Sequence, residues 1–76
     1  MKKKLEDYRI FENEYDYEAI VSDFWKSGYY TGKLHLIGSI LEWSDFKLSP
    51  KILIDTFEWK MKIEEYKKGK TNENQN

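Results

Sequence analysis

The hydrophobic residues of segment 17–27 recur with the period of a helix. They stand at i, i+3, i+4, i+7 and i+8, as Tyr17, Ile20, Val21, Phe24 and Trp25. On an α-helix this spacing places them in one stripe. Asp16, just before the stripe, is a favoured N-terminal cap, and Gly28 stands where a left-handed residue commonly ends a helix. The pattern and both caps predict a helix from Tyr17 to Ser27 that buries one face.

Segment 31–43 supports two interpretations. As a helix capped by Thr31, it carries two adjoining hydrophobic rows: Leu34, Ile37 and Leu41 in one, and Leu36, Ile40 and Trp43 in the other. Such a broad face suits a central core helix. As a strand, Leu34 and Leu36 alternate with polar neighbours, and Gly38 and Ser39 turn a hairpin. We favour the helix, although Gly38 costs it about 1 kcal/mol relative to Ala.

The third segment begins with Ser49 and Pro50, which are preferred at the N-cap and at the first helical position. Lys67 and Lys68, followed by Gly69, form a typical helix end, so a helix over 50–68 is expected. A period of two over residues 57–64 favours a strand instead. The caps at both ends lead us to prefer the helix.

As a helix, this segment has hydrophobic residues on two nearly opposite faces. One face carries Leu53, Phe57 and Met61, and the other carries Ile52, Trp59, Ile63 and Tyr66. We expect the chain's own fold to cover one face and a second copy to cover the other, which makes Ile52, Trp59, Ile63 and Tyr66 the candidate self-association residues. If the segment were a strand, this argument for a homodimer would disappear.

The two ends of the chain lack a helical pattern. In segment 5–15, Tyr8 and Ile10 share one strand face and Phe11 lies on the other, which predicts an extended arm packed across the helices. Residues 70–76 contain nothing apolar and are expected to form a disordered tail. The sequence thus predicts one all-α, three-helix domain over 1–76 with an ordered core over about 5–69. The alternative is an α+β fold with 33–43 and 57–64 as strands.

Because the chain is so short, its aromatic residues are expected to be important for its stability. Thirteen of the 76 residues are Trp, Tyr or Phe, whereas Cys is absent and His occurs once. A small domain without disulfides buries little surface, so large rings or a partner chain must supply the burial. The lack of Cys also fits a reducing compartment. No apolar run approaches the length of a membrane span, and Leu5 leads straight into Glu6, unlike a signal peptide. We expect a cytoplasmic protein that does not enter a membrane.

The sequence also contains few residues in positions suited to catalysis or metal binding. His35 is the single His, Ser39 is the near hydroxyl in the helix interpretation, and no acidic residue is spaced to orient the ring. The acidic residues between 12 and 18 lack the Gly and the twelfth-position Glu of a calcium loop. We therefore expect a non-enzymatic protein with no cofactor and no metal.

Charge is unevenly distributed, although the formal net charge is −1. Seven acidic residues and one Arg lie between Glu6 and Asp23. An acidic surface with Tyr side chains can steer toward and contact a basic partner. The candidate docking residues are Tyr8, Glu12, Glu14, Tyr15, Asp16, Tyr17 and Glu18. The expected function is a protein-binding regulator or inhibitor of a larger basic or nucleic-acid-handling protein. In its length and its Lys, Glu, Tyr and Asn content the chain resembles small accessory proteins of phages and mobile elements.

Two other functions compete with this one. A dimeric DNA-binding regulator would use the basic residues Lys60, Lys62, Lys67 and Lys68, and segment 24–34 loosely resembles a helix-turn-helix entry. Its recognition helix would begin at Pro50, where hydrophobic residues are poor readers of base edges. The second alternative is a structural or assembly subunit that binds copies of itself.

Overall fold

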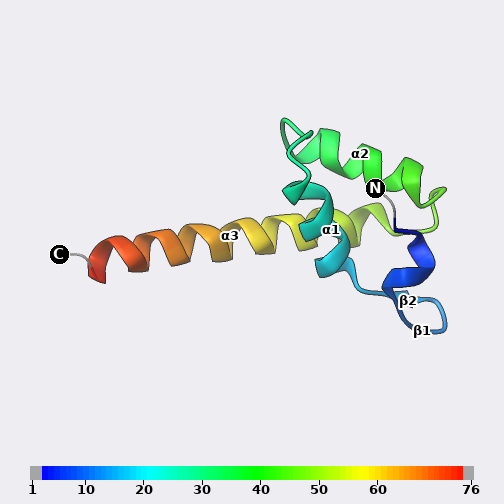
Figure 1. Ribbon diagram of the computed structural model, residues 1–76, viewed down its shortest axis with the longest axis horizontal. Helices are drawn as coiled ribbons and strands as arrows, with labels where there is room; N and C mark the ends of the chain where they lie inside the picture. Colours follow the sequence, from blue (N-terminus) through cyan, green and yellow to red (C-terminus); the bar gives the residue numbers. More distant parts are fainter. Residues whose placement is uncertain (1–2, 75–76) are drawn as a thin grey trace.

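The described part of the chain forms three helices preceded by a short turn and a small hairpin. The computed structural model describes the backbone of residues 3–74 and the side chains of residues 3–69. A 3₁₀ turn, η1 (Leu5–Tyr8), leads into the strands β1 (Arg9–Phe11) and β2 (Glu14–Tyr15). The helices α1 (Tyr17–Lys26), α2 (Lys33–Trp43) and α3 (Pro50–Asn74) follow. In Figure 1, α1 and α2 lie against the first half of α3, and the second half of α3 projects away from them.

The first helix matches the sequence prediction closely. Its cap is Asp16, whose Oδ1 accepts a hydrogen bond from the Ala19 backbone N–H at 3.1 Å. Gly28 has a φ of 78°, the left-handed conformation expected of the residue that ends the helix. Of the predicted stripe, Ile20, Val21 and Phe24 are buried, Tyr17 is half-buried and Trp25 is 37% exposed.

The second segment is a helix, so its interpretation as a strand was wrong. The helix is capped by Gly32 without a side-chain hydrogen bond, and the predicted cap at Thr31 is therefore also wrong. Leu36, Ile37 and Ile40 are buried, whereas Leu34 is 79% exposed. Two residues along a helix turn by about 200°, so Leu34 and Leu36 cannot both face the core.

The third segment is a helix as well, and the strand predicted as an alternative over 57–64 is absent from it. Ser49 caps it through an Oγ that accepts the Ile52 N–H at 3.4 Å. The stop predicted at Gly69 is wrong, because α3 continues to Asn74. A helical Gly costs only about 1 kcal/mol and does not by itself end a helix. Residues 70–74 of the predicted tail are thus helical, and Gln75 and Asn76 lie outside the described residues.

The N-terminal segment is not the extended arm that the sequence predicted. The turn η1 is followed by an antiparallel pair in which Arg9 lies opposite Tyr15 and Phe11 opposite Glu14. Glu12 adopts a φ of 41°, which reverses the chain between the strands. The fold is therefore mostly helical with one small two-stranded sheet.

One hydrophobic core joins the three helices to the N-terminal turn. Its buried members are Tyr8, Ile20, Val21, Phe24, Leu36, Ile37, Ile40, Leu48, Leu53 and Phe57. Trp43 packs edge-on against Phe24 and Tyr8, with ring centroids 5.1 Å and 5.7 Å apart. The largest fully buried side chains of this core are aliphatic, and the aromatic rings add edge-to-face contacts around them.

Candidate interaction surfaces

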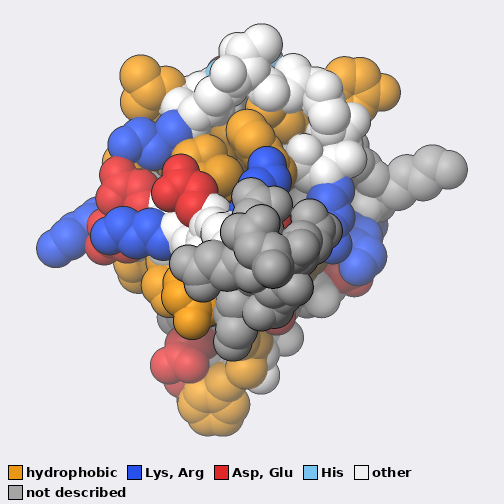
Figure 2. All heavy atoms as spheres, turned by 90° about the vertical axis from the view of Figure 1, so that its left-hand side faces the viewer, with side chains coloured by type: hydrophobic (Ala, Val, Ile, Leu, Met, Phe, Trp, Pro, Cys, Tyr) orange, Lys and Arg blue, Asp and Glu red, His pale blue; other side chains and the backbone are white. Residues whose placement is uncertain are grey.

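The hairpin exposes hydrophobic and acidic side chains together. Ile10 is 65% exposed and Phe11 63% exposed, and both stand on β1. Glu12 and Glu14 are exposed beside them. We call Ile10, Phe11, Glu12 and Glu14 the hairpin surface. Figure 2 looks along α3 from its C-terminal end and shows orange and red side chains together at the lower end of the molecule, where Figure 1 places the hairpin. Adjacent exposed apolar residues with charged neighbours are typical of a protein interaction site.

Several of the predicted docking residues have other roles. Tyr8 is 4% exposed, so its place in a docking surface was wrongly predicted. Tyr15 and Tyr17 are half-buried against the core, and the Tyr17 hydroxyl accepts the Ser49 backbone N–H at 3.0 Å. Asp16 is the cap of α1. Of the seven predicted residues, the exposed ones are Glu12, Glu14 and Glu18.

The sequence prediction missed Ile10 and Phe11 as surface residues. The available signal is the polar pair Glu12 and Asn13 directly after Ile10 and Phe11, because two residues are the commonest length of a tight hairpin loop. The loop lacks the Gly that usually marks such a turn. The local pattern therefore does not mark the tight turn or the outward position of the two strand residues.

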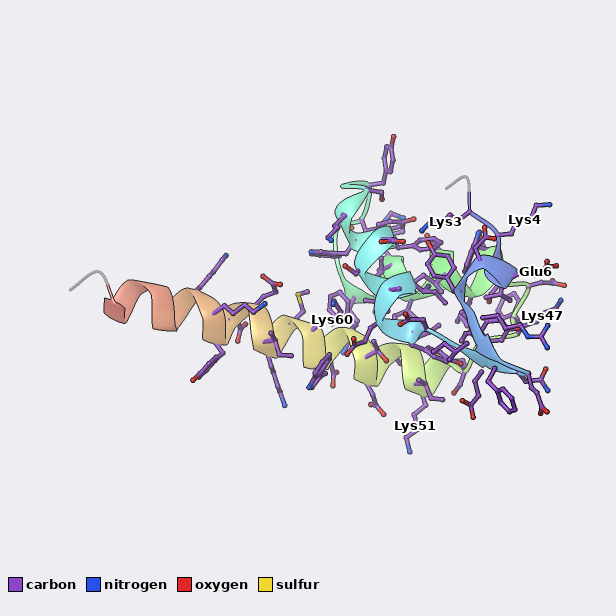
Figure 3. The ribbon with its side chains drawn as sticks, turned by 60° about the horizontal axis from the view of Figure 1, so that its bottom comes forward. Lys3, Lys4, Glu6, Lys47, Lys51 and Lys60 are labelled. Carbon is purple, nitrogen blue, oxygen red and sulfur yellow. The ribbon has the colours of Figure 1, made fainter. Side chains whose placement is uncertain are left out.

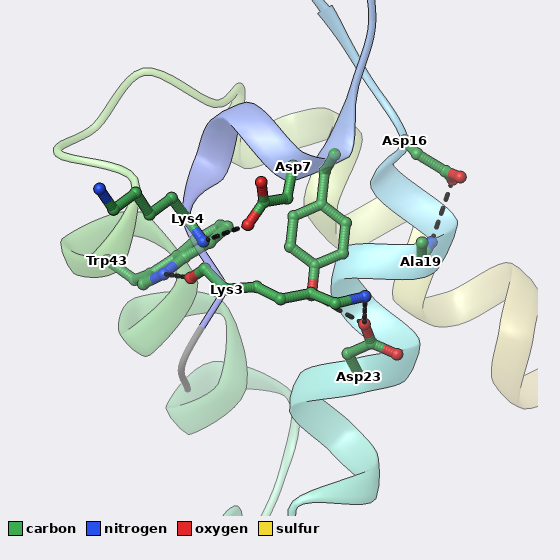
Figure 4. A network of polar contacts seen from close by, with 8 residues as sticks. Lys3, Lys4, Asp7, Asp16, Ala19, Asp23 and Trp43 are labelled. Atoms are coloured by element: carbon green, nitrogen blue, oxygen red, sulfur yellow. Dashed lines mark hydrogen bonds and ion pairs between the residues drawn. The ribbon is translucent and has the colours of Figure 1, made fainter.

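A polar network fixes the base of the hairpin to the helices, as Figure 4 shows. The Tyr8 hydroxyl donates to Asp23 Oδ2 at 2.7 Å, and Lys3 Nζ lies 3.8 Å from the same oxygen. Trp43 Nε1 donates to the Lys3 carbonyl at 3.2 Å. Burial, and then the hydrogen bond to the Asp23 carboxylate, raise the pKa of Tyr8 well above its usual range. The network ties η1 to α1 and α2.

The outer face of α3 is the second exposed hydrophobic region. Ile52, Trp59 and Tyr66 are 46%, 50% and 69% exposed, and Ile63 is half-buried. On the other side of the helix, Leu53 and Phe57 are buried and Met61 packs against the core. The single chain therefore buries one hydrophobic face of α3 and leaves Ile52 and Trp59 on the other about half exposed, and self-association through that outer face stays a prediction.

The four lysines predicted to bind DNA do not share one side of α3. Lys60 is half-buried and lines a groove of about 190 Å³ between α1 and α3, together with Trp25 and Glu64. Lys62 lies about 200° further round the helix, and Lys67 and Lys68 are exposed beyond the groove. Lysines elsewhere are also dispersed, since Figure 3 shows Lys51 and Lys3 on opposite sides of the body. The geometry offers no continuous basic stripe among the residues described.

His35 lies on the exposed side of α2 in a shallow hollow of about 350 Å³. Ser39 and Glu42 line the same hollow, but none of the side-chain hydrogen bonds of the described residues connects either of them to His35. The ring instead packs edge-on against Tyr30 at 5.3 Å. Across residues 3–69, no three His, Asp or Glu side chains are grouped closely enough to hold a metal ion.

None of the helices in the described part of the chain has an apolar run suited to crossing a bilayer. No protein-family model, curated protein or solved structure matches the chain. The assignment of a function therefore depends on the geometry of these surfaces.

Proposed function

We propose that this protein is a non-enzymatic, protein-binding regulator that docks through the hairpin surface on a basic region of a larger protein. The observation that carries the proposal is the pair Ile10 and Phe11, each more than 60% exposed and placed next to Glu12 and Glu14. Large apolar side chains supply most of the affinity of protein interfaces, and carboxylates around them steer a basic partner.

The hairpin is held in place before any partner arrives. The Asp16 backbone N–H donates to the Tyr8 carbonyl at 2.7 Å, which closes the base of the two strands. The Tyr8 ring is anchored in the core and its hydroxyl is bonded to Asp23. A surface that is already ordered loses less conformational entropy on binding, so more of its contact energy appears as affinity.

The carboxylates of this region are available to a partner. The ion pairs among the described residues are Lys3 with Asp23 and Lys33 with Glu58, and neither involves Glu12, Glu14 or Glu18. A basic groove that normally holds nucleic acid would be a suitable target, since carboxylates can occupy positions taken by phosphates. A protein bound in that groove would compete with the nucleic acid and act as an inhibitor.

Charge reversal tests the electrostatic part of the proposal. The test variant combines Glu12→Lys, Glu14→Lys and Glu18→Lys, and the matched control combines Glu42→Lys, Glu64→Lys and Glu65→Lys, which are exposed on other elements. Tagged protein captures partners from a cell lysate, and the affinity of the captured protein is then measured at low and high salt. We expect a loss of about tenfold or more for the hairpin variant, with little change in the control.

A second pair of variants tests the hydrophobic part. Phe11→Ser removes an exposed ring from the hairpin, and Leu34→Ser removes a side chain of similar exposure from α2. Neither residue is in the core, so both variants should remain folded. Partner affinity that survives both the Phe11 substitution and the hairpin charge reversal would refute the proposal. Capture of duplex DNA that depends on Lys62 and Lys67 would favour the DNA-binding alternative instead.

A further inference from the structure

A row of residues along the outer face of α3, exposed at Ile52, Trp59 and Tyr66 and half-buried at Thr56 and Ile63, follows the spacing of a coiled-coil seam. Steps of four and three residues alternate along the outer face, through Ile52, Thr56, Trp59, Ile63 and Tyr66. We call these five residues the α3 seam. In a two-stranded coiled coil this alternation keeps one row of side chains facing a partner helix. Ile52 and Trp59 remain about half exposed in the single chain, while the opposite side of the same helix is buried in the core.

The position of the seam leaves room for a second helix. The α3 helix spans 25 residues, and the body covers the side that carries Leu53 and Phe57. The seam lies on the other side of the helix, and beyond the body α3 projects into open space (Figure 1). A partner helix laid along the seam would therefore meet α3 without displacing α1 or α2.

Charges beside the seam distinguish the possible orientations. Asp55 and Lys62 flank the seam on one edge, seven residues or about 10 Å apart along the axis, and Lys60 and Lys67 flank the other edge. In an antiparallel pair, like edges face each other. When the two helices cross near residues 57 and 58, Asp55 of each copy faces Lys62 of the other, and this attraction occurs twice by symmetry.

The other arrangements bring lysines together. A parallel pair sets opposite edges face to face, so that Lys62 of one copy meets Lys67 of the other, although Asp55 then meets Lys60. A shift of the antiparallel register by one heptad would set Lys62 against Lys62 of the second copy. The register centred on residues 57 and 58 also places Trp59 opposite the small Thr56, and Ile52 opposite Ile63. Size and charge thus agree on one arrangement.

We infer that two copies of this protein form an antiparallel dimer through the α3 seam, in the register that pairs Asp55 with Lys62. This inference goes beyond the proposed function and uses other residues, since the hairpin surface takes no part in the seam. A symmetric dimer presents two hairpins and would bind a partner with two basic sites more tightly than one copy could.

The first test measures the mass of the purified chain by sedimentation equilibrium over a range of concentrations. We expect a monomer–dimer equilibrium that the Trp59→Glu substitution shifts to monomer, because it places a carboxylate in the seam. Leu34→Glu, on the exposed side of α2, is the matched control and should leave the dimer intact. A wild-type chain that stays monomeric up to about 1 mM, where even weak pairs form, would overturn the inference.

Charge exchange at the edge then tests the orientation. Lys62→Asp should weaken the dimer about tenfold, because Asp55 of the second copy would face a carboxylate. The double variant Asp55→Lys with Lys62→Asp should restore the original affinity to within about threefold. In a parallel dimer, Lys62→Asp would instead relieve repulsion with Lys67 and tighten the pair. A tighter dimer for the single variant would therefore contradict the antiparallel arrangement.

Both tests use the chain alone, and far-ultraviolet circular dichroism of each variant confirms that the helices are retained. Failure of the dimer would leave the hairpin proposal standing, because a monomer exposes the same hairpin surface. Loss of partner binding in the hairpin variants would equally leave the dimer untouched. The two proposals are thus separable by experiment.

Discussion

The Tyr8 hydroxyl donates its hydrogen bond to Asp23 from inside the core, which makes this residue a structural link between η1 and α1. Lys3 Nζ forms an ion pair with the same carboxylate at 3.8 Å. Ionisation of Tyr8 would bury a phenolate next to a carboxylate, and this is why its pKa is raised in the folded protein. Because Tyr8 is buried and its hydroxyl is bonded to Asp23, it contributes to the stability of the fold and cannot contact a partner protein.

The raised pKa of Tyr8 gives the protein a pH-dependent stability. The unfolded chain releases this proton near pH 10, whereas the folded chain retains it to higher pH. The contribution of Tyr8 is therefore fully present below about pH 10 and is lost as pH rises above that value. Tyr8→Phe should cost about 1–2 kcal/mol at pH 7 and make the free energy of unfolding fall less steeply above pH 10.

Urea denaturation of both proteins between pH 7 and about pH 11 checks this prediction. The other five tyrosines are present in both proteins, so the difference between the two curves isolates Tyr8. Tyr17→Phe is a useful control, since its hydroxyl accepts a backbone hydrogen bond and is not paired with a carboxylate. Parallel curves for the wild type and Tyr8→Phe would show that the buried hydroxyl ionises as it does in water.

At the scale of the elements, the helices were predictable because their signals are local. The hydrophobic stripe of α1 and its Asp16 cap are both present in one short segment, and Ser49 with Pro50 marks the start of α3. The start of α2 and the end of α3 depend on the backbone conformation of glycine residues and were not predictable from local signals. Gly32 starts α2 with a nearly extended backbone and no side-chain cap, and Gly69 is accommodated inside α3.

For the candidate docking site, the sequence predicted the exposed carboxylates correctly but the positions of the aromatic residues wrongly. Glu12, Glu14 and Glu18 are exposed, as solvated carboxylates should be. The assignment of strand faces assumed an unbroken alternation from Tyr8 to Phe11. A 3₁₀ turn ends at Tyr8 and directs its ring inward, and a register irregularity between Arg9 and Phe11 interrupts the alternation of strand faces, so both Ile10 and Phe11 are exposed. That direction is set by packing against α1 and α2, which no local pattern in the segment contains.

Two glycines allow the contribution of the backbone to be measured separately from packing. A Cβ added at Gly28 or at Gly38 would meet no atom within 4 Å. Gly38 lies inside α2, so Gly38→Ala should stabilise the protein by about 1 kcal/mol through helix propensity. Gly28 has a φ of 78°, so Gly28→Ala should destabilise it by about 1 kcal/mol or more.

Thermal and urea unfolding of the two variants provide the measurement, at protein concentrations low enough to keep the chain monomeric. Because the chemical change is the same at both sites and both sites are open, the sign of the effect reports the backbone conformation alone. Destabilisation by Gly38→Ala would mean that α2 is not a regular helix at that position in solution.

At the scale of the whole molecule, the protein is elongated because α3 continues well past its last contact with the core. The principal extents of the chain are 47 × 27 × 24 Å. The core ends along α3 with Phe57, and Met61 packs at its edge. The first half of α3 packs against the core and stabilises the fold, whereas its second half extends the molecule. This is typical of a helix whose stability comes from tertiary packing near one end.

Truncation separates these two parts. A chain that ends at Lys68 keeps the core and the α3 seam, and its free energy of unfolding should stay within about 1 kcal/mol of the full-length value. A chain that ends at Lys60 lacks Met61 and one wall of the groove between α1 and α3, and it should lose about 2 kcal/mol or more. Urea denaturation followed by Trp fluorescence reports both values, since Trp25 and Trp43 lie in the retained body. If the chain ending at Lys68 were also strongly destabilised, the terminal turns of α3 would have to contact the body or a second copy, because helix propensity alone is too weak to account for such a loss.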